Sequence, residues 1–97
     1  MDYKLYWTGE ALKNLDDILD YLSSRWTERE VKNFINKLSE QLEIILRFPL
    51  IFPHSEQQSR LRKAVLSKQT ILFYEIIDND IYLVRLFDGR KNSYKVQ

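Results

Sequence analysis

Two amphipathic helical stripes with almost no chain between them constrain this fold more than any other feature. The Thr8 hydroxyl can cap the first helix, and Thr27 and Glu30 have the spacing of a capping box at the start of the second. Only the few residues around Arg25 and Trp26 separate the stripes, so we expect an antiparallel helical hairpin. The apolar positions at helical spacing are Ala11, Leu12, Leu15, Ile18, Leu19 and Leu22, then Val31, Phe34, Ile35, Leu38, Leu42, Ile45 and Leu46.

The helical hairpin requires a sheet, because each stripe is too wide to be buried by the other helix alone. Polar and apolar residues alternate over residues 2–7, which predicts a first strand with one buried face. Phe48-Pro49 is predicted to end the second helix, and residues 50–59 are interpreted as a loop.

Three further strands are predicted at residues 61–66, 70–77 and 81–87. The links at 67–69 and 78–80 are short, and the second contains Asn and Asp, which tolerate the left-handed backbone of a tight turn. Strands joined this closely form an antiparallel meander, and the first strand then completes the sheet at one edge. The predicted fold is α+β with the order β-α-α-β-β-β, a helical hairpin packed on a small antiparallel sheet.

Composition narrows the classes of function. The chain has 97 residues, so we expect one domain over residues 1–97. The absence of cysteine excludes a disulfide framework, a thiol nucleophile and a cysteine zinc site. No apolar run approaches the roughly 18 residues of a membrane span, and residues 1–4 do not resemble a signal peptide, so we expect a soluble cytoplasmic protein.

Charge is divided unevenly along the chain. Residues 1–59 carry seven Lys and Arg against ten Asp and Glu, a net charge of −3. Residues 60–97 carry eight against four, a net charge of +4. This division favours a contact with nucleic acid or an acidic protein late in the chain, although scattered solvated cations would give the same totals.

An arginine interrupts the apolar last strand. Simple alternation groups Arg85 with Leu83 and Phe87 on one face. A guanidinium is rarely buried unless it is paired. Arg85 therefore either pairs with a carboxylate, for which Glu75 on the neighbouring strand is the candidate, or contacts phosphate or a partner molecule.

Other cations cluster near Arg85 in the sequence. Successive strand residues point to opposite faces, so at most one of Arg62 and Lys63 can join Arg85. Arginine suits phosphate recognition because its planar fork donates two hydrogen bonds at once. The alternative is that these cations protect sheet edges and aid solubility, which we favour for Lys63. The cluster consists of Arg60, Arg62, Lys63, Arg90 and Lys91.

Several kinds of site are not expected. The chain has no glycine-rich phosphate loop and no nucleophile elbow. His54 is the only histidine, so neither a metal site nor a cofactor is expected. Acid–base chemistry on RNA would need a proton-transfer group near the cations, and the candidates are His54, Tyr74, Tyr82 and Tyr94. Tyr74 and Tyr82 are more simply interpreted as packing residues of the sheet.

The order and spacing of these segments resemble the RelE/ParE superfamily of type II toxin–antitoxin toxins, and most closely its ParE branch. The resemblance covers nearly the whole chain. It is carried by Tyr6-Trp7-Thr8, the helix with Ala11, Leu15, Ile18 and Tyr21-Leu22, the Phe48-Pro49 break, and the meander with Arg62-Lys63-Ala64-Val65, Ile71-Leu72-Phe73-Tyr74-Glu75 and Val84-Arg85-Leu86-Phe87-Asp88-Gly89-Arg90-Lys91-Asn92.

The resemblance implies a bacterial toxin neutralised by a small cognate antitoxin, encoded beside it, whose flexible C-terminal part wraps the toxin. RelE-like members cut mRNA in the ribosomal A site, whereas ParE-like members poison DNA gyrase. By position, Arg85 matches the arginine of the last strand, and Arg62 or Lys63 matches the basic residues that open the meander.

Two departures favour the ParE branch. Asp88 stands where many nuclease members carry a histidine or tyrosine, and a carboxylate there would repel RNA phosphate. The net charge of +4 over the last third is also small for a ribosome-binding nuclease, because phosphate contacts supply most of the affinity.

The leading hypothesis is therefore a DNA gyrase poison without catalysis of its own. Its target contacts are predicted at Arg62, Arg85, Arg90 and Lys91, helped by residues 88–97. One alternative is a RelE-like endoribonuclease acting on mRNA at the ribosome, with Arg62, Arg85 and Tyr94 as its catalytic residues. Another is a non-toxic binding module on the same fold.

Overall fold

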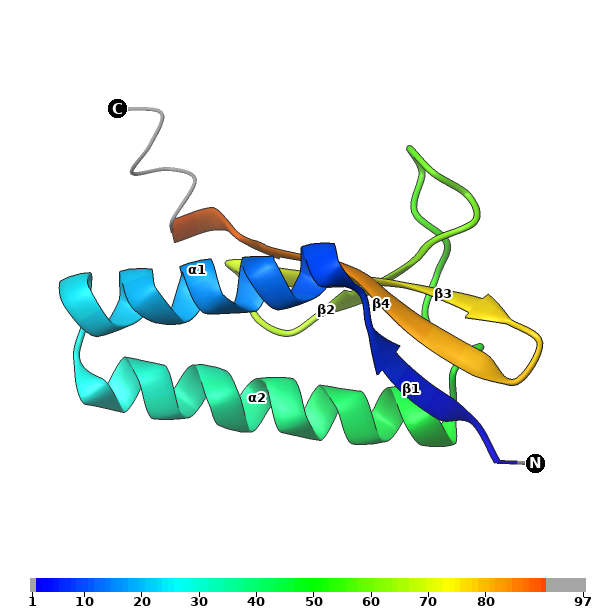
Figure 1. Cartoon of the computed structure of the whole chain (residues 1–97), viewed down its shortest axis with the longest axis horizontal. Helices are drawn as coiled ribbons and strands as arrows, with labels where there is room; N and C mark the ends of the chain where they lie inside the picture. The colour runs from blue at the N-terminus through cyan, green and yellow to red at the C-terminus, as the bar shows by residue number, and fades with distance from the viewer. Residues whose placement is uncertain (1, 91–97) are drawn as a thin grey trace.

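The computed structural model describes residues 2–90, which form two helices and four strands in the predicted order (Figure 1). This confirms the α+β class and the order β-α-α-β-β-β. No helix among residues 2–90 has an apolar stretch long enough to cross a bilayer. The elements are β1 (Lys4–Trp7), α1 (Gly9–Arg25), α2 (Glu28–Arg47), β2 (Arg62–Val65), β3 (Thr70–Ile77) and β4 (Asp80–Asp88).

Both helices begin at the predicted caps. Thr8 Oγ1 accepts a hydrogen bond from the first turn of α1, and Thr27 Oγ1 accepts one from the Glu30 amide at 3.3 Å. Only half of the predicted capping box forms. Within residues 2–90 the Glu30 carboxylate accepts a hydrogen bond from Arg90 and not from the Thr27 amide. As predicted, α2 ends where Phe48-Pro49 begins.

The four strands form one sheet in the order β1-β4-β3-β2. The meander of β2, β3 and β4 is antiparallel as predicted, and Asp78 in its second turn has a φ of 57°. The prediction of a wholly antiparallel sheet is wrong, because β1 pairs with β4 in parallel. Tight turns impose antiparallel pairing, whereas β1 is joined to the meander through two helices and a loop, and no turn fixes its direction.

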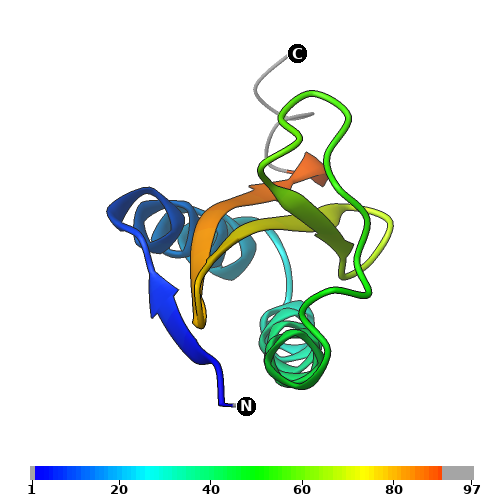
Figure 2. The ribbon, with the colours of Figure 1, turned by 90° about the vertical axis from the view of Figure 1, so that its right-hand side faces the viewer.

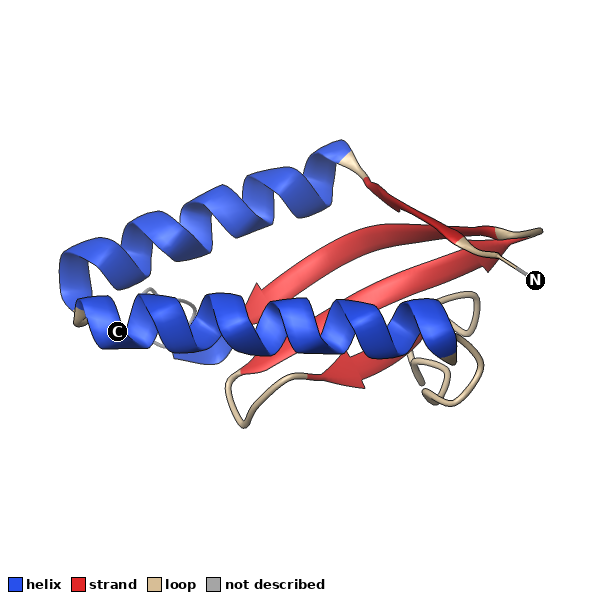
Figure 3. Ribbon diagram, turned by 90° about the horizontal axis from the view of Figure 1, so that it is seen from below, coloured by secondary structure: helices blue, strands red, loops and turns tan. Residues whose placement is uncertain are grey.

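The core lies between the helices and one face of the sheet. Figures 2 and 3 show α2 lying across this face and α1 running beside β4. Burying each large aliphatic side chain of such a core contributes roughly 1.5–3 kcal/mol. The core residues are Ala11, Ile18, Leu22, Phe34, Leu38, Ile45, Ala64, Leu72, Tyr74, Ile81, Leu83 and Leu86.

The opposite face of the sheet carries neither α1 nor α2 (Figure 2). We call it the outer face. On it Tyr6 and Tyr82 stack across β1 and β4, with ring centroids 5.4 Å apart and ring planes at 22°. Its residues, from strand register and burial, are Tyr6, Lys63, Val65, Ile71, Phe73, Glu75, Tyr82, Arg85 and Phe87.

Candidate functional site

A β-bulge on β4 determines where Arg85 points. Phe73 is opposite Arg85 in the sheet, but the next residue, Tyr74, is opposite Leu83. Val84 is therefore an extra residue on β4, and the alternation of its side chains shifts by one position. Leu83 and Leu86 are both buried, while Arg85 between them is exposed on the outer face. The grouping of Arg85 with Leu83 on one face was wrong, because alternation alone takes no account of the bulge.

The ion pair considered between Arg85 and Glu75 does not form. Glu75 is opposite Tyr82 in the register and pairs instead with Arg60, whose Nη1 lies 3.0 Å from Glu75 Oε1. The Arg85 guanidinium lies over the Phe87 ring, 5.6 Å from its centroid. Within residues 2–90 Arg85 makes no ion pair, and its charge is available on the outer face.

Lys63, for which we favoured edge protection, lies on the same face as Arg85. Phe73 is opposite Lys63 on β2 and opposite Arg85 on β4. The three side chains therefore form a row across three strands, with a cation on each side of an aromatic ring. Sequence alternation allowed either Arg62 or Lys63 to join Arg85, and the bulge decides for Lys63.

Arg62 points to the other face and holds the loop that precedes β2. Its Nη1 donates to the carbonyl oxygens of Leu50 at 3.2 Å and Phe52 at 2.7 Å. Close by, the Tyr74 hydroxyl donates to the Pro49 carbonyl at 2.5 Å. Arg62 thus fastens the loop to the sheet and does not converge with Arg85.

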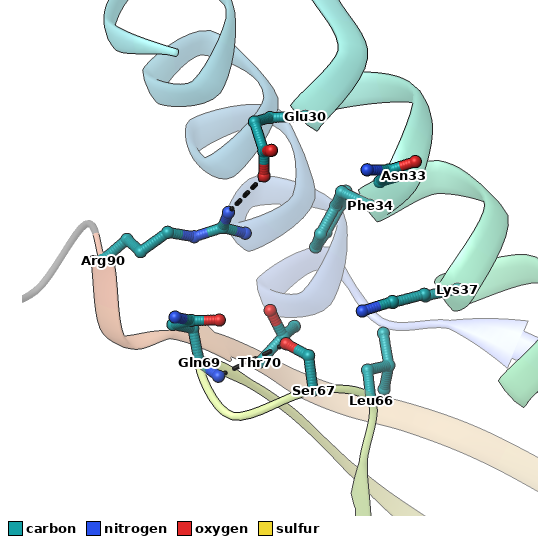
Figure 4. A pocket seen from close by; sticks show the side chains of 9 residues that line it. All are labelled: Glu30, Asn33, Phe34, Lys37, Leu66, Ser67, Gln69, Thr70 and Arg90. Carbon is teal, nitrogen blue, oxygen red and sulfur yellow. Dashed lines mark hydrogen bonds and ion pairs between the residues drawn. The ribbon is translucent and has the colours of Figure 1, made fainter. Parts of the chain in front are cut away.

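Arg90 also points inward, into a cluster that joins the end of β4 to the helical hairpin (Figure 4). Its Nη2 lies 3.0 Å from Asp88 Oδ2, its Nη1 lies 3.3 Å from Glu30 Oε1, and its guanidinium lies 5.4 Å from the centre of a Trp26 ring. Asp88 also accepts a hydrogen bond from the Thr70 hydroxyl at 2.9 Å. We call Trp26, Glu30, Thr70, Asp88 and Arg90 the Arg90 cluster.

Asp88 is not the exposed, phosphate-repelling carboxylate expected from the sequence. Its side chain is 1% exposed and is bonded to Thr70 and Arg90. The charge of Asp88 is therefore compensated inside the protein, and this residue is no longer an argument against a nucleic-acid target.

The cavity beside the Arg90 cluster is small, about 80 Å³ (Figure 4). Glu30 and Arg90, paired with each other, line one side of it, and Lys37 reaches toward it from α2. Thr70 is bonded to Asp88, so the hydroxyl of this lining residue also has a partner within the protein.

Of the candidate proton-transfer groups among residues 2–90, Tyr82 shares the outer face with Arg85, and His54 and Tyr74 do not. His54 is exposed on the loop and is opposite Arg62, at the far edge of the sheet from β1. Burial raises the pKa of Tyr74 to about 12, and Arg62 opposes this only in part. Desolvation and the nearby Asp80 raise the pKa of Tyr82. Lys91 and Tyr94 lie outside the described residues.

Known proteins resemble this chain in sequence and in fold. Residues 5–93 match the family model described as the ParE toxin of the type II toxin–antitoxin system parDE. Among curated proteins, none matches the chain.

Solved structures of toxin–antitoxin systems share the fold. The chromosomal ParDE system of P. aeruginosa matches with a TM-score of 0.74 and 16% identity, over 89% of this chain and 95% of that one. The E. coli DinJ-YafQ complex matches with a TM-score of 0.65 and 14% identity, over 94% of this chain and 97% of that one. The RelBE2 complex of Mycobacterium tuberculosis matches with a TM-score of 0.61 and 16% identity, over 91% of this chain and 99% of that one.

At these identities the solved structures establish the fold, while the family model spans almost the whole described chain. The chain therefore belongs to the ParE toxin family of type II toxin–antitoxin systems.

Proposed function

We propose that this toxin poisons DNA gyrase by binding it through the outer face, without catalysis of its own, and that a cognate antitoxin neutralises it in the bacterial cytoplasm. Arg85 is the central contact of the proposed surface. Lys63 joins it on the basis of the strand register, and Lys91 stays in the contact set as a sequence-based expectation. In this proposal the effect of Arg62 and Arg90 on the target is indirect. Arg62 holds the loop before β2 in place, and Arg90 holds the end of β4.

One observation carries the proposal. The aromatic neighbours of Arg85 on the outer face, Phe73 and Phe87, cannot accept or donate a proton. Tyr82 lies three residues before Arg85 on β4, and its raised pKa makes it a poor base. The carboxylates of Glu10 and Asp17 line a cavity with Arg85, where they would repel RNA phosphate. Cleavage of RNA needs a group within hydrogen-bond reach of the 2′-hydroxyl that can take its proton. An exposed arginine set among aromatic side chains is instead typical of a binding hot spot, where Arg, Tyr and Trp are enriched.

The antitoxin part of the proposal is supported by the relatives. The matching family is described as the toxin of a ParDE system, and the E. coli and M. tuberculosis structures are toxin–antitoxin complexes. We infer that this chain likewise binds a small partner protein encoded beside it.

A second candidate is the RelE-like endoribonuclease, and one feature favours it. The row of Lys63, Phe73 and Arg85 alternates cations with an aromatic ring, and Phe87 lies under Arg85. Such surfaces bind single-stranded RNA through phosphate contacts and base stacking. In this reading Tyr94 would supply the proton-transfer group, together with Arg62 and Arg85.

The deciding experiment compares gyrase inhibition with mRNA cleavage in purified systems. We expect the wild-type chain to block DNA supercoiling by gyrase and to leave ribosome-bound mRNA intact. Arg85→Ala should weaken gyrase inhibition at least tenfold, since hot-spot residues carry about 2 kcal/mol or more. Arg29→Ala is the matched control, because Arg29 is an exposed arginine on α2.

Two results would contradict the proposal. If the chain cleaves mRNA and Tyr94→Phe abolishes the cleavage, the toxin is an endoribonuclease. Equal effects of Arg85→Ala and Arg29→Ala would show that the outer face is not the contact surface.

A further inference from the structure

Four large apolar side chains are exposed close together in sequence, where α2 runs into the loop before β2 (Figure 1). Ile44 is 38% exposed, Phe48 56%, Leu50 63% and Ile51 62%. Single exposed apolar residues are ordinary, but a continuous exposed group of large ones usually marks an interaction site. We call Ile44, Phe48, Leu50 and Ile51 the α2 patch.

The backbone that carries the α2 patch is fixed by hydrogen bonds. Arg62 donates to the carbonyl oxygens on both sides of Ile51. The Ile51 amide donates to the Phe48 carbonyl at 3.2 Å, so the chain turns tightly directly after α2. Side chains on a fixed backbone lose little freedom when a partner covers them, which favours binding. The exposure of the patch is therefore built into the fold.

Charged residues lie beside the patch on α2. Glu40, Glu43 and Arg47 line a shallow depression together with Ile44. Within residues 2–90 none of these three charges makes an ion pair, although Glu43 and Arg47 are one helical turn apart. Because a helix has about 3.6 residues per turn, all three lie on the same side of Ile44. This side of the patch thus carries an acid, an acid and a base in order along the helix.

We infer that the α2 patch joins two copies of this chain into a two-fold symmetric dimer. This inference goes beyond the proposed target and antitoxin and depends on neither. A two-fold interface is self-complementary, because the same surface of each copy meets the other. When two α2 helices pack antiparallel with the two-fold axis near Ile44, Arg47 of each copy lies between Glu40 and Glu43 of the other. A second copy therefore supplies the opposite charges that one chain leaves unpaired.

The exposed area is sufficient for a reversible dimer. A fully exposed large side chain presents roughly 200 Å², so the α2 patch offers about 400–500 Å² per copy. With their polar neighbours, two such patches reach the roughly 1,000 Å² that a specific interface needs. This is the low end of the range, so we expect a dimer that dissociates on dilution. α2 lies on the opposite side of the sheet from the outer face (Figure 2), so the dimer contact does not involve Arg85.

Sedimentation equilibrium of the full chain alone tests the dimer. Over about a hundredfold range of concentration, the average mass should rise from one chain toward two and no further. Leu50→Ser should weaken association at least fivefold. It should leave the urea unfolding midpoint unchanged, because the Leu50 side chain is exposed and its carbonyl still bonds Arg62. Leu12→Ser is the matched control, since Leu12 is exposed on α1, and it should associate like the wild type.

Charge reversal tests the antiparallel arrangement. Arg47→Glu should be monomeric, and so should the double variant Glu40→Arg with Glu43→Arg, since each places like charges opposite one another. Mixed in equal amounts, the two should form a heterodimer, because every facing pair then has opposite charges. Arg29→Glu, which changes the net charge equally at an exposed position outside the patch, is the control. It should form homodimers and should bind the double variant no better than the wild type does.

Three outcomes would overturn the inference. They are a chain that stays monomeric at every concentration, equal association of Leu50→Ser and Leu12→Ser, and a mixture of the charge variants that forms no heterodimer. If the chain alone is monomeric and Leu50→Ser weakens binding of the antitoxin, the α2 patch is an antitoxin contact instead. Gyrase enters none of these measurements, so failure here is distinguishable from failure of the proposed target.

Discussion

Arg85 and Arg90 lie close together at the end of one strand, yet their surroundings give them opposite roles. Arg85 follows the bulge and is exposed beside Phe87, while the Arg90 side chain is only 14% exposed and sits between two carboxylates. Removing one member of an ion pair inside the protein destabilises the fold, whereas a charge left on an aromatic face is available to a partner.

Arg90→Ala should destabilise the protein by about 3 kcal/mol. The substitution leaves the buried Asp88 carboxylate without its partner, and removing one member of a buried pair costs several kcal/mol. Urea unfolding at neutral pH measures the loss. Arg60→Ala is the control, because Arg60 is 57% exposed and its pair with Glu75 should contribute about 0.5 kcal/mol. Similar losses for both variants would contradict a stabilising role of the Arg90 cluster.

Tyr74→Phe should cost about 1 kcal/mol at pH 7, because the Pro49 carbonyl loses its donor. The pH dependence has a defined sign. Burial raises the pKa of Tyr74 to about 12, while an unfolded tyrosine ionises near pH 10. The stability due to neutral Tyr74 is full below pH 10 and is lost as the pH rises toward 12.

The difference in unfolding free energy between wild type and Tyr74→Phe should therefore shrink between pH 9 and pH 11, as measured by urea unfolding. Tyr6→Phe is the control, since Tyr6 is 42% exposed on the outer face. A constant difference over this range would show that Tyr74 ionises equally in the folded and unfolded chain.

At the scale of elements, Thr8 joins β1, α1 and β4. Its hydroxyl accepts from the α1 backbone and donates to the Leu83 carbonyl at 2.7 Å. Thr8→Ala should cost about 2 kcal/mol, roughly twice the cost of Thr27→Ala, because Thr27 only caps its helix. Thr8→Ser should restore most of the loss. Thermal or urea unfolding of the three variants checks this, and equal losses for the two alanine variants would contradict the role of Thr8 in the sheet.

Elements defined by local sequence were predicted well. The caps at Thr8 and Thr27, the stop at Phe48-Pro49 and the turn at Asp78 depend on residues close in sequence, and all four are present. The strand at residues 70–77 has the predicted bounds, and the other three differ by one or two residues at their ends, where local signals are weakest.

Features that depend on contacts between distant segments were not predicted. The parallel pairing of β1 results from the helical crossover, and the bulge at Val84 from the fit of β4 to β3. The bulge reverses the face of Arg85 and places it on the same face as Lys63, not on that of Arg62, which the predicted contact set contains. One sequence signal did point to an irregular strand. Strict alternation along residues 81–87 would turn the charged Arg85 toward the core and the apolar Leu86 toward solvent.

At the scale of the whole molecule, the Arg90 cluster brings the last described residues back onto both helices. Asp88 and Arg90 connect β4 to Thr70 of β3, Glu30 of α2 and Trp26 between the helices. Residues 88–90 are therefore part of the fold, and the prediction that residues 88–97 as a whole serve target contact does not hold for Asp88.

Two truncations separate folding from target binding. Removal of residues 91–97 leaves the Arg90 cluster intact, so we expect the urea unfolding free energy to change by less than about 1 kcal/mol. Removal of residues 88–97 also deletes Asp88 and Arg90, which should cost several kcal/mol and leave the Thr70 hydroxyl buried without its partner.

If Lys91 contacts gyrase, the variant that lacks residues 91–97 should inhibit gyrase at least tenfold more weakly than the wild type. It should still unfold cooperatively at nearly the wild-type urea concentration. Retained inhibition would confine the target surface to the outer face around Arg85 and Lys63. If the variant that lacks residues 91–97 is unfolded, those residues contribute to stability, and the Arg90 cluster alone does not keep the chain folded.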